Sequence, residues 1–144
     1  MTKAINFDMD GTLADFYGVE NWLFYLENSN TYPYDVAKPL VNMSILARYL
    51  NKLQRKGYKI NIISWLSKNS TAEFDKKVTE SKKKWLKIHL SSVHWDEITI
   101  VPYGVNKSTL GSGILFDDEA YNREMWGNGA YDVHNILDVL KKIA

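Results

Sequence analysis

The sequence contains no cysteine, which excludes a disulfide framework, thiolate ligands for zinc and a cysteine nucleophile. It has no apolar run long enough to cross a membrane, and residues 1–3 lead toward a strand without the apolar core of a signal peptide. Basic and acidic side chains nearly balance, since 18 of the first and 17 of the second give a net charge of +1. Stable binding to nucleic acid is therefore not expected. We expect one cytoplasmic domain, residues 1–144, with a single core.

Segments with strand and helix patterns alternate along the chain. The expected strands are residues 4–8, 59–63, 97–101 and 114–117, with a short fifth segment near 130–131. The expected helices are residues 43–56, a segment opening at residue 70, and a terminal helix around residues 136–143. This order predicts an α/β fold with a doubly wound, mainly parallel sheet. Ligands bind such sheets beyond the carboxyl ends of the strands, where the strand order reverses.

Two carboxylates, Asp8 and Asp10, end the first expected strand and are followed by Gly11. Residues i and i+2 of a strand share a face, so both acids can lean toward one point. Their charges repel unless a cation lies between them. Magnesium commonly binds through one or two carboxylates and a substrate phosphate, and Gly11 lets the backbone turn close to a ligand. The pattern indicates a site for phosphate and Mg²⁺.

The run Asp-Met-Asp-Gly-Thr-Leu-Ala-Asp-Phe at residues 8–16 resembles motif I of the haloacid dehalogenase-like phosphohydrolases, and in particular their 5'(3')-deoxyribonucleotidase branch. That superfamily carries three further motifs in order: a Ser or Thr after the second strand, a Lys, and an acidic pair after a later strand. Here Ser64, Lys107 and Asp117-Asp118 follow in that order. The four motifs span nearly the whole chain, and the resemblance implies a Rossmannoid fold.

The resemblance also implies a magnesium-dependent phosphomonoester hydrolase that acts through a phosphoaspartate. Asp8 would be the nucleophile, and Asp10 would be the general acid and base. The residues expected to bind phosphate are Ser64, Lys107, Gly11 and Thr12. The residues expected at the metal are Asp8, Asp10 through its backbone carbonyl, Asp117 and Asp118. Of the last two, Asp117 is assigned the direct contact by analogy, and Asp118 a contact through water.

An insertion is expected between the first two motifs. Fifty-four positions separate Asp10 from Ser64, whereas a crossover helix with its loops needs roughly 30. The surplus, approximately residues 16–41, predicts a small helical cap, which in the resembled family closes over the active site and selects the substrate. This segment is rich in aromatic residues, which are alternatively the buried side of an extra helix.

Two aromatic residues are expected to bind substrate. Phe16 matches a base-contacting position of the deoxyribonucleotidases, and Trp65 directly follows Ser64, although a core role for Trp65 is equally open. Aromatic faces stack on nucleobases at about 1 to 3 kcal/mol each. The expected substrate is therefore a 5'-(deoxy)nucleoside monophosphate.

Other functions stay open. A short cap leaves room for a polynucleotide end or for another small phosphomonoester, and a non-catalytic binding module is disfavoured because no catalytic position is missing. Base preference, sugar preference and oligomeric state do not follow from the sequence.

The remaining candidates are weaker. The lysine run at residues 82–84 is expected to form a solvated helix face, with polynucleotide binding as the alternative. Asn122 and Trp126 are expected in a loop without a definable role. The three histidines lack the spacing of metal ligands.

Overall fold

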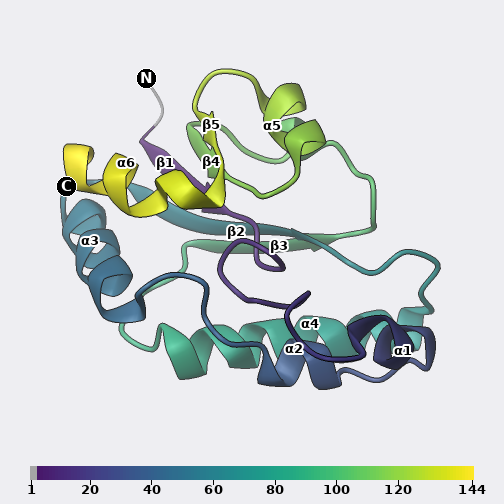
Figure 1. Ribbon diagram of the computed structural model, residues 1–144. Helices are drawn as coiled ribbons and strands as arrows, with labels where there is room; N and C mark the ends of the chain where they lie inside the picture. Colours follow the sequence, from purple (N-terminus) through teal and green to yellow (C-terminus); the bar gives the residue numbers. More distant parts are fainter. Residues whose placement is uncertain (1–2) are drawn as a thin grey trace.

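The computed structural model describes residues 3–144, which contain a five-stranded parallel sheet (Figure 1). The strands are β1 Ala4–Phe7, β2 Lys59–Trp65, β3 Glu97–Val101, β4 Ile114–Phe116 and β5 Ala130–Tyr131. Their order across the sheet is β3-β2-β1-β4-β5. The chain builds outward from one side of β1 and then from the other, so the strand order reverses between β1 and β4. The predicted doubly wound α/β sheet is confirmed.

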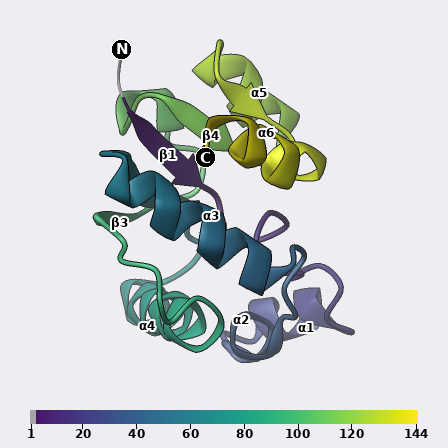
Figure 2. The same cartoon turned by 90° about the vertical axis from the view of Figure 1, so that its left-hand side faces the viewer.

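Helices cover both faces of this sheet. They are α1 Trp22–Glu27, α2 Tyr32–Val36, α3 Met43–Arg55, α4 Ala72–His89, α5 Ala120–Trp126 and α6 Ile136–Ile143, with 3-10 turns η1 Lys107–Thr109 and η2 Val133–Asn135. Figure 1 shows α4 on one side of the sheet and α5 on the other. Figure 2 shows α3 crossing the sheet between α4 and α6. Within residues 3–144, no helix combines the length and apolar character needed to cross a bilayer.

Caps and apolar stripes explain the two long helices. The Asn42 side chain accepts the Ile45 N–H at the start of α3, and the Thr71 hydroxyl accepts the Phe74 N–H at the start of α4. Each helix then buries one stripe of side chains. The buried residues of α3 are Leu46, Leu50 and Leu53. They join apolar side chains of β1 and β2 in the main core, which fixes the strand ends that carry the candidate site.

Residues 16–41, which we name the cap segment, contain the short helices α1 and α2. Phe16 and Tyr34 pack against Phe74 and Val78 of α4 in a second, smaller core. By contrast, α1 buries none of its residues. Its most exposed apolar side chains are Leu23 and Phe24. The cap segment is thus anchored on α4 through Phe16 and α2, and α1 packs on this core through the partly buried Trp22 and Leu26.

The segment after the acidic pair is a helix, so the expectation of a loop is wrong. Residues 120–126 form α5, which ends at Gly127 with a positive φ of 84°. Asn122 is the only buried residue of this helix. Because α5 buries a polar side chain and no apolar stripe, hydrophobic periodicity could not reveal it.

Candidate functional site

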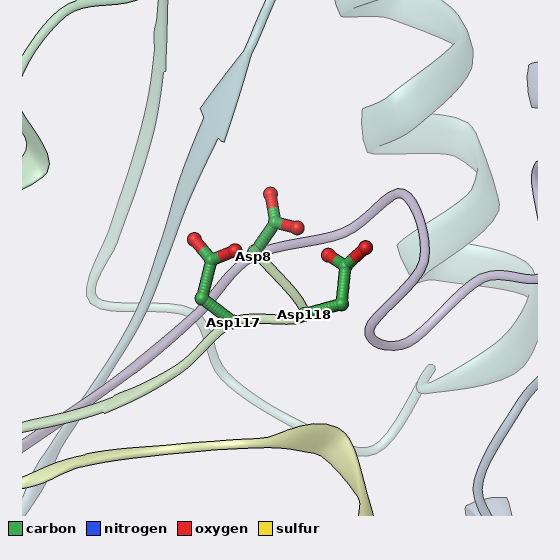
Figure 3. A group of neighbouring side chains, drawn as sticks. All are labelled: Asp8, Asp117 and Asp118. Atoms are coloured by element: carbon green, nitrogen blue, oxygen red, sulfur yellow. The ribbon is translucent and has the colours of Figure 1, made fainter. Parts of the chain in front are cut away.

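Three carboxylates meet beyond the carboxyl ends of β1 and β4. Asp8 follows β1, and Asp117 and Asp118 follow β4. Each offers an oxygen atom, and these oxygens all lie within 4.8 Å of one another. Figure 3 shows the three side chains projecting from neighbouring backbone segments toward a common region. The group, which we name the acid cluster, lies where the strand order reverses, as expected. The Asp10 carboxylate is not part of it.

Lys107 binds two members of the acid cluster. Its Nζ lies 3.0 Å from Asp8 Oδ1 and 2.7 Å from Asp117 Oδ2, and all three side chains are buried. Burial is the largest single influence and opposes the charge of Asp8, but the Lys107 ammonium, hydrogen bonds with Asp118 and Lys107, and the charge of Lys82 together hold the pKa of Asp8 below its ordinary value. Burial likewise opposes the charge of Lys107, but Asp8 and Asp117 raise its pKa. Asp8 is therefore ionised and Lys107 is a fixed cation beside it.

Gly11 and Thr12 bring the loop after β1 against Asp118. The Thr12 hydroxyl lies 3.1 Å from both Asp8 Oδ2 and Asp118 Oδ1, and it accepts the Asp118 backbone N–H at 3.2 Å. A Cβ built on Gly11 would lie 2.4 Å from Asp118 Oδ2, and the φ of Gly11 is 82°. Only glycine fits this turn, because a side chain would strike the Asp118 carboxylate.

Two members of the acid cluster, Asp117 and Asp118, bind protons more tightly than isolated carboxyls do. Burial, and then the charge of Asp8, raise the pKa of Asp117 to about 6 and that of Asp118 to about 8. Burial also raises the pKa of Asp10, although the adjacent Lys82 opposes that rise. A divalent cation relieves such repulsion, since it replaces protons on ligand oxygens. The all-oxygen donor set is the kind that Mg²⁺ prefers, so the cluster can hold this ion.

Asn122 is a site residue to which the sequence assigned no role. Its Nδ2 donates to Asp117 Oδ2 at 3.1 Å, while its Oδ1 is buried and has no partner among residues 3–144. Asp117 also accepts the Glu119 N–H at 2.9 Å through Oδ1 and the Lys107 ammonium through Oδ2. Helix α5 thus fixes Asp117 from one side. The only sequence signal was proximity to the acidic pair.

Ser64 and Asp10 meet at a second lysine. Lys82 Nζ lies 2.6 Å from Ser64 Oγ, 2.7 Å from the Trp65 backbone oxygen and 3.1 Å from Asp10 Oδ2. Lys82 is 1% exposed, so the expectation that the run 82–84 is wholly solvated is wrong for its first member. Lys83 and Lys84 are exposed, as expected.

The sequence did carry a signal for Lys82. It lies four residues after Val78 and three before Trp85, so it occupies the buried stripe of α4. A run of three lysines suggests an exposed surface unless each lysine is assigned to a face of the helix separately. Within the run, only Lys82 falls on the stripe.

A cavity of about 260 Å³ adjoins these groups. Phe16 lines it but is 3% exposed, because its ring packs against Tyr34 at a centroid distance of 4.6 Å. Trp65 also lines it, packs on the Tyr103 ring at a centroid distance of 4.9 Å and donates its Nε1–H to the Val105 backbone oxygen at 2.8 Å. The lining residues with charged or amide side chains include Asp8, Asp10, Lys107, Asp118 and Asn122. The cavity thus joins an aromatic wall to the acid cluster.

No protein-family model and no curated protein matches this chain. Among solved structures it is similar to the D,D-heptose 1,7-bisphosphate phosphatase of Burkholderia thailandensis, with a TM-score of 0.58, 8% identity and coverage of 99% of this chain and 98% of that one. It is also similar to the same phosphatase of B. bronchiseptica, complexed with magnesium and phosphate, with a TM-score of 0.60, 9% identity and the same coverage. The chain therefore has the haloacid dehalogenase-like, Rossmannoid α/β fold.

Proposed function

We propose that this protein is a magnesium-dependent phosphomonoester hydrolase that acts through a phosphoaspartate at Asp8. One observation carries the proposal: a buried Asp8 shares a single site with the Lys107 ammonium and two further carboxylates. A carboxylate nucleophile splits the hydrolysis of a phosphate ester into two easier steps. The low identity to the similar structures limits their support to the fold.

We place Mg²⁺ against Asp8 and Asp118. Asp117 accepts hydrogen bonds on both oxygens, from Glu119 N, Lys107 and Asn122, whereas the Asp118 carboxyl meets only the Thr12 hydroxyl and Asp8 among residues 3–144. This favours Asp118 for direct contact and gives Asp117 the task of holding Lys107, which reverses the assignment made by analogy. When bound, the ion neutralises charge between the phosphate and the carboxylates.

The remaining steps follow from this chain's own side chains. Asp8 attacks phosphorus in line, and Lys107 compensates charge on the phosphoryl oxygens. Asp10, whose pKa burial raises, donates a proton to the leaving alkoxide and then takes one from the attacking water. The Ser64 hydroxyl donates a hydrogen bond to a phosphoryl oxygen. The two aspartates of motif I thus need opposite protonation states, and the opposite directions of their pKa shifts support this division of roles.

The substrate we propose is a 5'-(deoxy)nucleoside monophosphate. Its support is the aromatic lining of the cavity, to which Phe16, Tyr17, Trp65 and Tyr103 contribute. Flat bases gain more from such a wall than sugars do. A sugar phosphate is the second candidate, because both similar structures are named as sugar bisphosphate phosphatases. A polynucleotide end is the third.

Phosphate release from a panel of substrates tests the proposal. The panel holds deoxy- and ribonucleoside monophosphates, sugar phosphates, 5'-phosphorylated oligonucleotides and a simple aryl phosphate, each with Mg²⁺ and with a chelator. We expect magnesium-dependent release that is fastest with mononucleotides and absent in Asp8→Asn. Faster release from sugar phosphates would overturn the substrate, and release by Asp8→Asn would overturn the mechanism.

A further inference from the structure

Lys82 is a second buried ammonium in the site, distinct from Lys107. The two lysines serve different groups: Lys107 binds Asp8 and Asp117, whereas Lys82 binds Ser64 and Asp10. They also come from different elements, since Lys107 begins η1 and Lys82 lies in α4. Nothing in the four motifs assigns a role to Lys82.

The hydrogen bonds of Lys82 determine which way Ser64 can act. An ammonium has three N–H donors and no acceptor, and its three short contacts are Ser64 Oγ, the Trp65 backbone oxygen and Asp10 Oδ2. The Ser64 oxygen must therefore accept from Lys82, which leaves its own proton free to point elsewhere. Among residues 3–144, Ser64 Oγ has no second hydrogen-bonding partner. The Ser64 hydroxyl is therefore oriented to donate a hydrogen bond to another group.

The surroundings hold Lys82 in this geometry. Its stem lies in the buried stripe of α4, and its Nζ lies 5.5 Å from the centroid of the Tyr34 ring in α2 of the cap segment. The ammonium therefore connects α4, the end of β2, the loop after β1 and the cap segment. Three of these elements also line the cavity, through Asp10, Tyr34 and Trp65.

We propose that Lys82 is a positioning residue for phosphate binding, an inference that rests on the proposed function. It orients the Ser64 hydroxyl so that this group donates to a phosphate oxygen, and it holds the Asp10 side chain beside the leaving group. The ligand class is a phosphomonoester dianion or free inorganic phosphate. Lys107 binds the nucleophile directly, and Lys82 acts through Ser64.

A purely structural role makes a different prediction. Removal of Lys82 leaves Asp10 without its partner, which is costly for a buried pair, but the Asp10 side chain is 18% exposed and lines the cavity, so solvent can compensate its charge. Position 82 belongs to an otherwise apolar stripe that includes Val78 and Trp85, so Lys82→Met can keep the fold while it removes all three hydrogen bonds. The Lys82→Met variant can then lose phosphate binding without losing the fold.

The test is a double-mutant cycle between Lys82 and Ser64 with two readouts. The variants are Lys82→Met, Lys82→Arg, Ser64→Ala, the Lys82→Met/Ser64→Ala double variant, and Lys83→Met as an exposed control on the same helix. The readouts are kcat and KM for an aryl phosphate, and the Kd of inorganic phosphate by calorimetry in Mg²⁺. Melting temperatures verify folding, and Lys82→Gln replaces Lys82→Met if the latter does not fold.

We expect Lys82→Met to weaken phosphate binding and lower kcat/KM by about 10-fold to 100-fold, the range of a hydrogen bond to a charged group. Ser64→Ala should lose a similar factor, and the double variant should lose little more than either, because the two residues act as one unit. Lys82→Arg should recover part of the loss. Lys83→Met should match the unmodified protein.

The outcomes separate the two proposals. Equal behaviour of Lys82→Met and Lys83→Met, or fully additive losses in the cycle, overturns the role of Lys82 while the hydrolase proposal stands. If the unmodified protein hydrolyses nothing but binds phosphate, the hydrolase proposal fails and the Kd series still decides the role of Lys82. Absence of both hydrolysis and phosphate binding overturns both.

Discussion

The acid cluster and the cap segment are built on opposite physical principles. In the acid cluster, charged side chains from distant parts of the sequence hold one another: Lys107 bridges Asp8 and Asp117, and Thr12 bridges Asp8 and Asp118. In the cap segment, aromatic rings pack on α4, and α1 buries none of its own residues.

This difference separates two kinds of residue. Buried charges tolerate almost no substitution, since removal of one partner leaves the other uncompensated. Aromatic packing accepts other large apolar groups at modest cost. We therefore assign the chemistry to the acid cluster and the choice of substrate to the cap segment.

The largest expected effect is at the motif I aspartates. Asp8→Asn should abolish turnover because an amide cannot form the acyl phosphate, and Asp10→Asn should lower kcat by about 10² to 10⁴ because it removes the proton donor. Steady-state phosphate release from purified variants measures both. Asp15, whose side chain accepts the Gly18 N–H at 3.1 Å, lies outside the cluster, so Asp15→Asn is a nearby control. A loss there as large as that of Asp8→Asn would contradict the assignment to Asp8 and Asp10.

Magnesium should act on the acid cluster and leave the cap segment unaffected. At an ion concentration 100 times the Kd, binding should stabilise the fold by about 2.7 kcal/mol and raise the melting temperature by roughly 5 to 10 °C. Differential scanning fluorimetry with Mg²⁺ and with a chelator measures this shift. Asp118→Asn should lose most of it, and a shift that survives in this variant would place the ion elsewhere.

The cap segment predicts a selective effect. Phe16→Ala should lower kcat/KM for a preferred nucleotide by roughly 5-fold to 150-fold, corresponding to about 1 to 3 kcal/mol of stacking. Hydrolysis of a small aryl phosphate should change little, because Ser64 and Lys107 are untouched. Phe24→Ala, at an exposed position of α1, controls for loss of an aromatic ring from the cap segment. Equal losses of kcat/KM on both substrates would show that Phe16 supports the fold and does not contact the base.

The smallest expected effect is a pH dependence of stability without metal. In the folded protein Asp117 keeps its proton up to about pH 6 and Asp118 up to about pH 8, whereas the unfolded chain loses both at about pH 4. The raised pKa of Asp10 acts in the same direction. The free energy of unfolding should therefore fall as the pH rises from about 4 to about 8. The lowered pKa of Asp8 acts with the opposite sign, but below about pH 4.

Urea unfolding at several pH values measures this slope. Saturating Mg²⁺ should flatten it, because the ion replaces the protons. Asp118→Asn should also flatten it without metal. A slope that is unchanged in Asp118→Asn would mean that other groups cause it.

Much of the site could be predicted because its residues end strands. In a parallel sheet, the carboxyl ends of neighbouring strands meet at one edge, so Asp8, Ser64 and Asp117 were brought together by topology alone. Two contributions could not be predicted in this way. Lys82 acts from the middle of a helix, and Asn122 from a helix with no apolar stripe, so both depend on orientation rather than on strand order.

Detection of a phosphoryl group on Asp8 tests the proposed phosphoaspartate mechanism most directly. Turnover of an aryl phosphate is quenched in acid within the first catalytic cycles, the protein is digested, and the peptides are analysed by mass spectrometry. We expect a peptide containing Asp8 that carries one acid-stable, base-labile phosphoryl group, enriched in Asp10→Asn and absent in Asp8→Asn. Turnover with no phosphorylated peptide, or with the phosphoryl group on a residue other than Asp8, would contradict this mechanism.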